Sequence, residues 1–187
     1  MPLPVQGGVE LSYQGWNLGP IIGGKNYSPG AVKQAGGVVS VHVPPGAELD
    51  ALIHPVSSLK GELTFEYSVT GTFYQVEHPD NPGLMTVMFQ RRGDDWYAKN
   101  GTEWYRWYSN DTFTLAPGAH SGSVSFADLS QWISVLGQPA ASNPAQYNAA
   151  LNNVANLQFV FGGPGGRGHG VASVDGATFT LTSVTVK

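Results

Sequence analysis

Apolar and polar residues alternate along several stretches of this 187-residue chain, most clearly between Glu62 and Thr70. Side chains at successive positions of a β-strand point to opposite faces, so this pattern predicts a strand with one buried face. The pattern recurs at 38–43, and the stretch 84–92 is apolar on both faces, as in a central strand. The inward positions that we predict to form a common core are Leu63, Phe65, Tyr67, Val69, Phe159, Phe161, Phe179 and Leu181.

The other apolar stretches complete the set of expected strands. Strands are predicted at 9–14, 102–109, 157–163 and 176–186, and the stretch 44–58 is interpreted as a connection. In the last strand the apolar positions change parity after Leu181, which predicts a β-bulge near Thr182 and Ser183.

Two stretches have the period of a helix instead of a strand. Ser125 and Asp128 have the spacing of a capping box, and apolar residues then recur at intervals of three and four. Asn143 followed by Pro144 is typical of a helix N-terminus. We therefore predict two short helices, near residues 126–136 and 144–155.

The chain carries 25 glycines and 13 prolines between its predicted strands, and it shows neither an internal repeat nor a change in composition. Many short strands separated by turn residues are typical of sandwiches and jelly rolls. We predict one domain, 1–187, with an all-β fold: a two-sheet antiparallel β-sandwich of the jelly-roll type that also carries the two short helices.

Charge and hydropathy exclude several classes of partner. Only 12% of residues are charged, the net charge is −4, and nine Lys plus Arg do not form the basic stripe that nucleic acid requires. No apolar run approaches the roughly 20 residues that span a bilayer, so no membrane partner is expected. The start lacks the pattern of a signal peptide. Localisation stays open: extracellular if a leader was removed, or a virion surface if the protein belongs to a phage.

The familiar catalytic motifs are weak in this chain. The stretch Gly162–Gly170 contains a formal G-x-G-x-x-G, but a strand rather than a helix is expected after it, so we predict a mobile loop that binds no nucleotide. The five histidines lack zinc-binding spacing. Glu62 and Glu66 would lie about 13 Å apart on one strand, too far for a glycosidase pair. A pair from different strands, such as Glu66 with Glu103, stays open.

The stretch 94–111 concentrates aromatic side chains beside acids, and it holds three of the five tryptophans. Flat aromatic rings beside polar groups are suited to stacking on sugar rings. Strand alternation would place Trp104, Arg106 and Tyr108 on one face and Trp107 on the other. One set is expected in the core, and the other is covered by a loop, lies in an interface or is exposed for binding. The candidate ligand-binding residues are Trp96, Tyr97, Trp104, Trp107, Asp95, Glu103 and Arg106, with Arg167 and His169 on a loop near the site.

The stretches "LTFEYSV", "LMTVMFQRRGDDWY", "YRWYS", "LQFVFGG" and "ATFTLTSVTV" resemble, in rhythm and order, the galactose-binding-like jelly-roll carbohydrate-binding modules. The resemblance covers about residues 59–186. It implies a lectin-like fold and a poly- or oligosaccharide partner. Such families often carry a calcium ion near the terminal strands, so Ca²⁺ is a possible cofactor, although the last strand here has no acidic residue.

Three functions remain open from the sequence. The leading hypothesis is a non-catalytic carbohydrate-binding module that stacks sugar on surface aromatics. The second is a structural protein of a phage, virion or other surface assembly, for which self-association would be expected. The third is a β-sandwich glycosidase or polysaccharide lyase, so enzymatic activity stays undecided, with a non-enzymatic role favoured.

Overall fold

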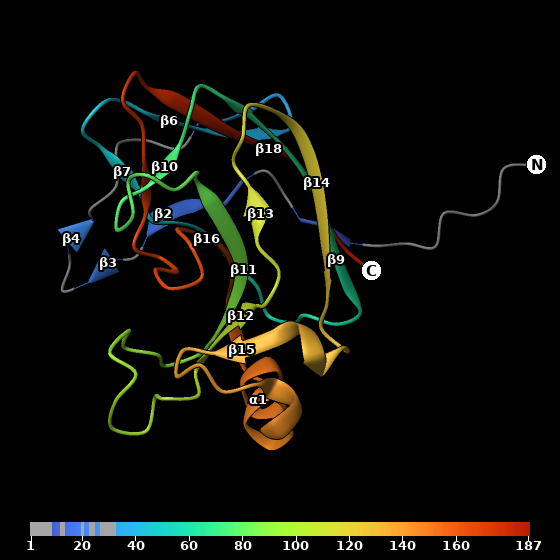
Figure 1. Cartoon of the computed structure of the whole chain (residues 1–187). Coiled ribbons are helices and arrows are strands. Elements are labelled where there is room, and N and C mark those ends of the chain that lie inside the picture. The colour runs from blue at the N-terminus through green and yellow to red at the C-terminus, as the bar shows by residue number, and fades with distance from the viewer. Residues whose placement is uncertain (1–8, 12–13, 20, 23–24, 27–32) are drawn as a thin grey trace, which may run out of the picture.

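The computed structural model describes residues 9–11, 14–19, 21–22, 25–26 and 33–187, and within them it shows two antiparallel sheets packed face to face (Figure 1). The first, sheet A, has the order β14-β9-β18-β6-β5, with β1 also paired to β18. Its strands are β1 (Val9–Glu10), β5 (Lys33–Ala35), β6 (Val38–Val43), β9 (Glu62–Thr70), β14 (Gly118–Ser125) and β18 (Ala177–Val186).

The second, sheet B, has the order β15-β12-β11-β16-β8-β2, with β13 also paired to β11. Its strands are β2 (Asn17–Gly19), β8 (Ala51–Pro55), β11 (Leu84–Arg91), β12 (Arg106–Ser109), β13 (Phe113–Thr114), β15 (Trp132–Ser134) and β16 (Val154–Phe161). The short strands β7 (Glu48–Leu49), β10 (Tyr74–Gln75) and β17 (Val171–Ala172) form a small third sheet, and β3 (Ile21–Ile22) pairs with β4 (Lys25–Asn26).

The order of the long strands is that of a jelly roll. Along the chain the eight principal strands are β6, β8, β9, β11, β12, β14, β16 and β18. Four of them form the run β14-β9-β18-β6 in sheet A and four form the run β12-β11-β16-β8 in sheet B, so the chain crosses repeatedly between the sheets. The all-β antiparallel sandwich predicted from the sequence is confirmed.

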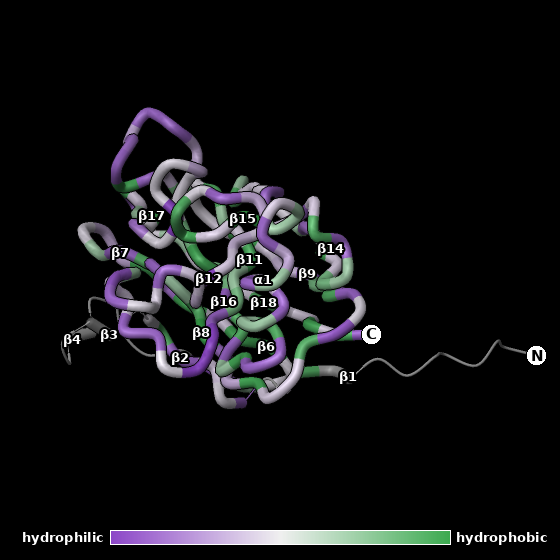
Figure 2. Tube along the Cα trace, turned by 90° about the horizontal axis from the view of Figure 1, so that it is seen from below, coloured by the Kyte–Doolittle hydropathy of each residue, from purple (hydrophilic) through white to green (hydrophobic). Residues whose placement is uncertain are grey.

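The core lies between the two sheets, and all eight predicted core residues are in it, each at most 2% exposed. The predicted bulge is also present, because the register of β18 against β9 shifts between Leu181 and Ser183. Figure 2 shows the hydrophobic segments mainly along the strands and the hydrophilic ones in the peripheral loops. The predicted strand at 9–14 is described only in part, because residues 12–13 lie outside the described residues.

One of the two predicted helices is wrong. The segment 126–136 forms a single 3₁₀ turn at Leu129–Gln131 and then the edge strand β15, which pairs with β12. Asp128 does cap the turn, accepting a hydrogen bond from the Ser130 amide at 3.0 Å. Over so few residues, the apolar spacing fits the period of a helix and that of a strand. Strand β12 has a free edge beside this segment, and pairing with it makes the extended conformation more favourable.

The second helix is present but shorter than predicted. Helix α1 spans Pro144–Leu151, and Val154 already belongs to β16. The buried ring of Tyr147 packs edge-on against Phe89 and Trp107, and its hydroxyl donates to the carbonyl oxygen of Phe126 at 3.0 Å. The helix thereby closes one end of the sandwich, at the bottom in Figure 1.

The outer faces of the two sheets differ in chemistry. The outer face of sheet A carries mostly short hydroxyl side chains in register, such as Ser123, Thr64 and Thr185 across three neighbouring strands. The outer face of sheet B instead carries a second apolar cluster, formed by Ala51, Met88, Tyr108 and Val160. The strands that carry Met88 and Val160 also contribute apolar side chains to the core from their other face, so these strands are buried on both faces. An outward face that is itself buried needs a cover, and two loops supply it.

Candidate functional site

A network of amides lies beside the apolar cluster on the outer face of sheet B. The side-chain oxygen of Gln90 accepts hydrogen bonds from Asn156 at 2.7 Å and from Gln158 at 3.1 Å, and Gln158 also donates to Asn156. The Gln90 amide nitrogen donates to the Asp94 carboxylate at 2.6 Å. These hydrogen bonds hold the polar side chains on the outer face of sheet B in place and connect them to the loop that contains Asp94.

That loop, residues 92–101, is called here the Trp96 loop. The Asp94 carboxylate is fully buried, and one of its oxygens lies 2.9 Å from Nε of Arg106. The two side chains form an ion pair, but the Nε–H bond does not point at the oxygen, so this contact is not a hydrogen bond. Arg106 also donates to the carbonyl oxygen of Trp96 at 2.8 Å and places its guanidinium 5.2 Å from the centre of the Trp96 ring. The loop is therefore clamped to strand β12 by a buried arginine.

The backbone of the Trp96 loop is strained. Trp96, Ala98 and Asn100 all have positive φ angles, 69°, 50° and 56°. A bulky residue in the left-handed region costs free energy, and such residues collect where the surrounding structure holds a side chain in place for a task. Here the strain and the arginine clamp together position the Trp96 ring over the sheet.

The second covering loop, residues 162–170, is called here the glycine loop, and it is compact rather than open. Backbone hydrogen bonds run from Gly168 and Gly170 to Phe161, and from His169 to Gly166. A Cβ atom on Gly170 would lie 2.4 Å from Oδ1 of Asp50. The glycines thus allow a tight fold against the sheet, and the mobility expected from the sequence stays a prediction.

A pocket of about 360 Å³ lies between the two loops on the outer face of sheet B. The Trp96 loop contributes Trp96, and the glycine loop contributes the cationic Arg167 together with His169, whose ring lies 2.7 Å from the Glu77 carboxylate. Strand β12 contributes Arg106 and Tyr108. The full set of lining residues is Glu48, Asp50, Ala51, Trp96, Arg106, Tyr108, Val160, Arg167, Gly168 and His169.

Asp50 is the most unusual group in this pocket. The residue is 9% exposed, and Oδ1 has no hydrogen-bond partner among the described residues. Burial, reinforced by repulsion from Glu48 and opposed by His169, raises the pKa of Asp50 from 3.8 to about 6. A buried acceptor without a donor costs free energy, so Oδ1 of Asp50 is a candidate acceptor for a hydrogen bond from a ligand.

Other unpaired polar atoms lie on the same face of the protein. Among the described residues, seven buried side-chain nitrogen or oxygen atoms have no aligned hydrogen bond, and they include Oδ1 of Asp50, Oγ1 of Thr86, Oε1 of Gln158 and Nε of Arg167. Thr86 lies in register with Val160 and Ala51 of the pocket floor, and Gln158 in register with Met88. Native proteins leave few such atoms unpaired, so this face is the candidate binding face.

The structure brings together four of the nine residues singled out from the sequence. Trp96, Arg106, Arg167 and His169 all line the pocket. Tyr97 lies on the Trp96 loop, 63% exposed, but does not line the pocket. Asp95 accepts hydrogen bonds from the Tyr97 amide and the Thr102 hydroxyl, which lower its pKa, and Glu103 accepts one from the Gly101 amide. These two acids shape the loop.

Trp104 and Trp107 lie on the opposite side of sheet B from the pocket. Trp107 is fully buried in the core, and its indole stacks on Trp104 with ring centres 5.9 Å apart. The alternation expected over 102–109 begins only at Arg106, where β12 starts, so Trp104 does not share the face of Arg106 and Tyr108. Trp107 is therefore core-filling, the half-buried Trp104 packs against the core, and Trp96 is the tryptophan of this stretch that lines the pocket.

Sequence reasoning missed Glu48 and Asp50, because the stretch 44–58 was interpreted as a connection, whereas it contains β7 and β8. The signal that could have revealed them is the pair of acids two residues apart, Glu48 and Asp50, on either side of the apolar Leu49. Tyr108 was placed on the correct face but was not selected.

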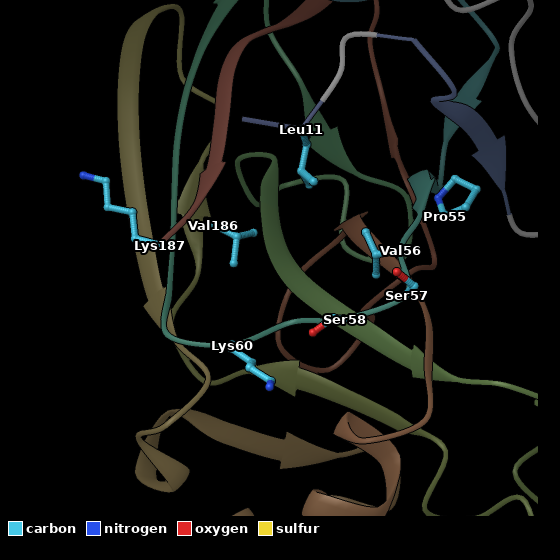
Figure 3. Close-up of a pocket in the computed structure, with 8 residues that line it drawn as sticks. All are labelled: Leu11, Pro55, Val56, Ser57, Ser58, Lys60, Val186 and Lys187. Atoms are coloured by element: carbon cyan, nitrogen blue, oxygen red, sulfur yellow. The ribbon is translucent and has the colours of Figure 1, made fainter. Parts of the chain in front are cut away.

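A second pocket, of about 540 Å³, lies near the chain end and is lined by Leu11, Pro55, Val56, Ser57, Ser58, Lys60, Val186 and Lys187 (Figure 3). It offers no aromatic side chain, and none of its lining residues carries a buried unpaired polar atom. In Figure 3 the Lys187 side chain extends away from the apolar residues. These features make it a weaker candidate than the pocket on sheet B.

In the described part of the chain, no group of three or more His, Asp or Glu side chains is arranged to hold a metal ion. Within the same residues, no helix has the length and hydropathy to cross a membrane.

Comparison of the sequence with protein families and with curated proteins gives no match. Among solved structures, the fold is similar to the xylan-binding module CBM15, at 10% identity over 96% of this chain and 95% of that one, with a TM-score of 0.44. It is also similar to the N-terminal cellulose-binding domain of β-1,4-glucanase C from Cellulomonas fimi, at 15% identity over 86% of this chain and 84% of that one, with a TM-score of 0.41. These similarities are distant, and they assign no function to this chain.

Proposed function

We propose that this protein is a non-catalytic carbohydrate-binding module and that it binds polysaccharide on the outer face of sheet B, between the Trp96 loop and the glycine loop. The sugar stacks its C–H face against Trp96, and its hydroxyl groups donate to Asp50. This site retains Trp96, Arg106, Arg167 and His169 from the sequence-based set and adds Asp50, Glu48 and Tyr108.

The observation that supports this proposal most strongly is the unpaired, buried Oδ1 of Asp50 in a pocket that also holds a strained, clamped tryptophan. A sugar ring supplies the two complements at once, because it has an apolar face for the aromatic ring and hydroxyl donors for the carboxylate. A purely apolar ligand would leave Asp50 unpaired.

The expected affinity is modest. Stacking on one aromatic ring adds roughly 0.5–1.5 kcal/mol beyond burial, and much of the gain from polar contacts is lost to desolvation. We therefore expect dissociation constants of about micromolar to millimolar for oligosaccharides.

The test is isothermal titration with soluble polysaccharides, starting with xylan and hydroxyethylcellulose and extending to mannan and β-glucan. Trp96→Ala is expected to weaken binding at least about tenfold. Tyr97→Ala is the matched control, because it removes a neighbouring, more exposed aromatic that does not line the pocket. Equal losses in the two variants, or no binding by the wild type to any polysaccharide, would contradict the proposal.

Hydrolysis of a glycosidic bond is the second candidate, and one observation favours it. A carboxyl with a pKa of about 6 in a pocket is suited to general acid catalysis, and Glu48, two residues away, supplies a second acid. Both acids line the same pocket, as a pair of glycosidase carboxyls would. Release of new reducing ends from a bound polysaccharide, lost in Asp50→Asn and Glu48→Gln, is the decisive assay.

A further inference from the structure

Arg167 is a cation without a counterion. It lies on the glycine loop with its guanidinium 5.8 Å from the centre of the Tyr108 ring. One amino group donates to the carbonyl oxygen of Pro164 at 2.7 Å, and the buried Nε has no aligned partner. Among the described residues, no carboxylate comes within 4.0 Å of it, although Glu48 and Asp50 line the same pocket.

The other charges around the pocket are already balanced or are anionic. Arg106 is paired with Asp94, and His169 with Glu77. Glu48 and Asp50 are the remaining anions, and neither forms an ion pair within the described part of the chain. The pocket therefore presents a free guanidinium and two free carboxyls that do not neutralise each other.

A ligand complementary to this arrangement needs one anionic group and several hydroxyl donors. A carboxylate fits the fork of a guanidinium, and hydroxyls fit the acceptors of Asp50 and Glu48. A sugar ring with several charges, as in a highly sulfated glycan, would instead be repelled by the two acids. A sugar ring that carries a single carboxylate meets both requirements.

Building on the proposed function, we infer that the pocket on sheet B recognises uronic-acid residues of a polysaccharide, with the uronate carboxylate paired to Arg167 and ring hydroxyls donating to Asp50. Arg167 is then the residue that determines specificity, while Trp96 supplies affinity common to all sugars.

The experiment compares acidic polysaccharides with their own carboxyl-reduced products by isothermal titration. The probes are oligomers of glucuronoxylan, polygalacturonate and alginate, each beside its reduced form. At least one acidic oligomer is expected to bind about tenfold or more tightly than its reduced form, and the difference should shrink as salt is raised. Arg167→Gln should reduce the difference to less than about threefold, with Arg167→Lys between the two.

The matched control is Arg92→Gln, which removes the same charge from the Trp96 loop without touching the pocket lining. If acidic and reduced oligomers bind equally, the uronate inference is wrong and the carbohydrate-binding proposal stands. If Arg167→Gln and Arg92→Gln weaken binding to the acidic oligomer equally, the preference comes from overall charge, and the inference fails. If neither form of any polysaccharide binds, both the inference and the proposed function are overturned.

Discussion

The buried pair of Asp94 and Arg106 provides a sharp test of how the site is built. The Asp94 side chain is fully buried and that of Arg106 is 8% exposed, and Asp94 also accepts from Gln90. Asp94→Ala removes the counterion and leaves a buried guanidinium unpaired. Breaking a buried pair in this way costs about 3–5 kcal/mol. For a chain of this length each kcal/mol lowers Tm by about 2–4 °C, so a fall of roughly 6–20 °C is expected.

The double variant Asp94→Ala with Arg106→Met separates the ion pair from simple loss of packing. Removing both charges removes the desolvation penalty as well, so its stability should lie within about 2 kcal/mol of the wild type. Urea unfolding followed by tryptophan fluorescence measures both variants, with a constant m value as the check on two-state behaviour. If the double variant loses at least as much free energy of unfolding as Asp94→Ala alone, the reasoning is refuted. Because the pair positions Trp96, both variants should lose polysaccharide binding even where stability recovers.

Three further predictions follow from other parts of the structure. Trp107→Ala should cost about 3–5 kcal/mol of unfolding free energy because the ring is fully buried, whereas Trp96→Ala should cost clearly less, and comparing the two Tm values checks this. The raised pKa of Asp50, about 6, means that its favourable contribution is complete below about pH 4 and is lost as pH rises through 6. At pH 7.5 the free energy of unfolding of Asp50→Asn should therefore exceed that of the wild type by on the order of 2–3 kcal/mol, and near pH 4 the difference should disappear. Urea unfolding of both proteins between pH 4 and pH 7.5 measures this difference. Gly122→Ala should destabilise the protein although its φ is not in the left-handed region, because its Cβ would lie 2.4 Å from the Phe65 ring; an unchanged Tm would show that the ring moves aside easily.

The sequence by itself determined the fold class and the core. Strands such as β9 and β18 alternate strongly, and their apolar residues can be buried only on one face, so their inward positions follow directly from the order of residues. The bulge near Ser183 was visible for the same reason, since a change of parity requires an extra residue in the strand.

Strands without a strong apolar pattern were decided by tertiary pairing. Strand β14 consists of small and polar residues for most of its length, and it forms because the edge of β9 offers partners along all eight of its positions. Similarly, the stretch predicted as a helix at 126–136 became β15 because β12 was available beside it. Backbone hydrogen bonding to a neighbour depends on which strands meet, and no local pattern contains that information.

The site was decided almost entirely by the tertiary structure. The sequence identified Trp96 and Arg106 by their residue types, and Arg167 and His169 by their place on a glycine-rich loop. It could not reveal that they meet around Asp50, because Asp50, the stretch 94–111 and the glycine loop are far apart in the chain. Local alternation also failed to assign Trp104, whose face depends on where β12 begins. A buried carboxyl acquires its raised pKa and its unpaired oxygen only when the fold surrounds it, and these properties therefore belong to the assembled sandwich rather than to the sequence pattern.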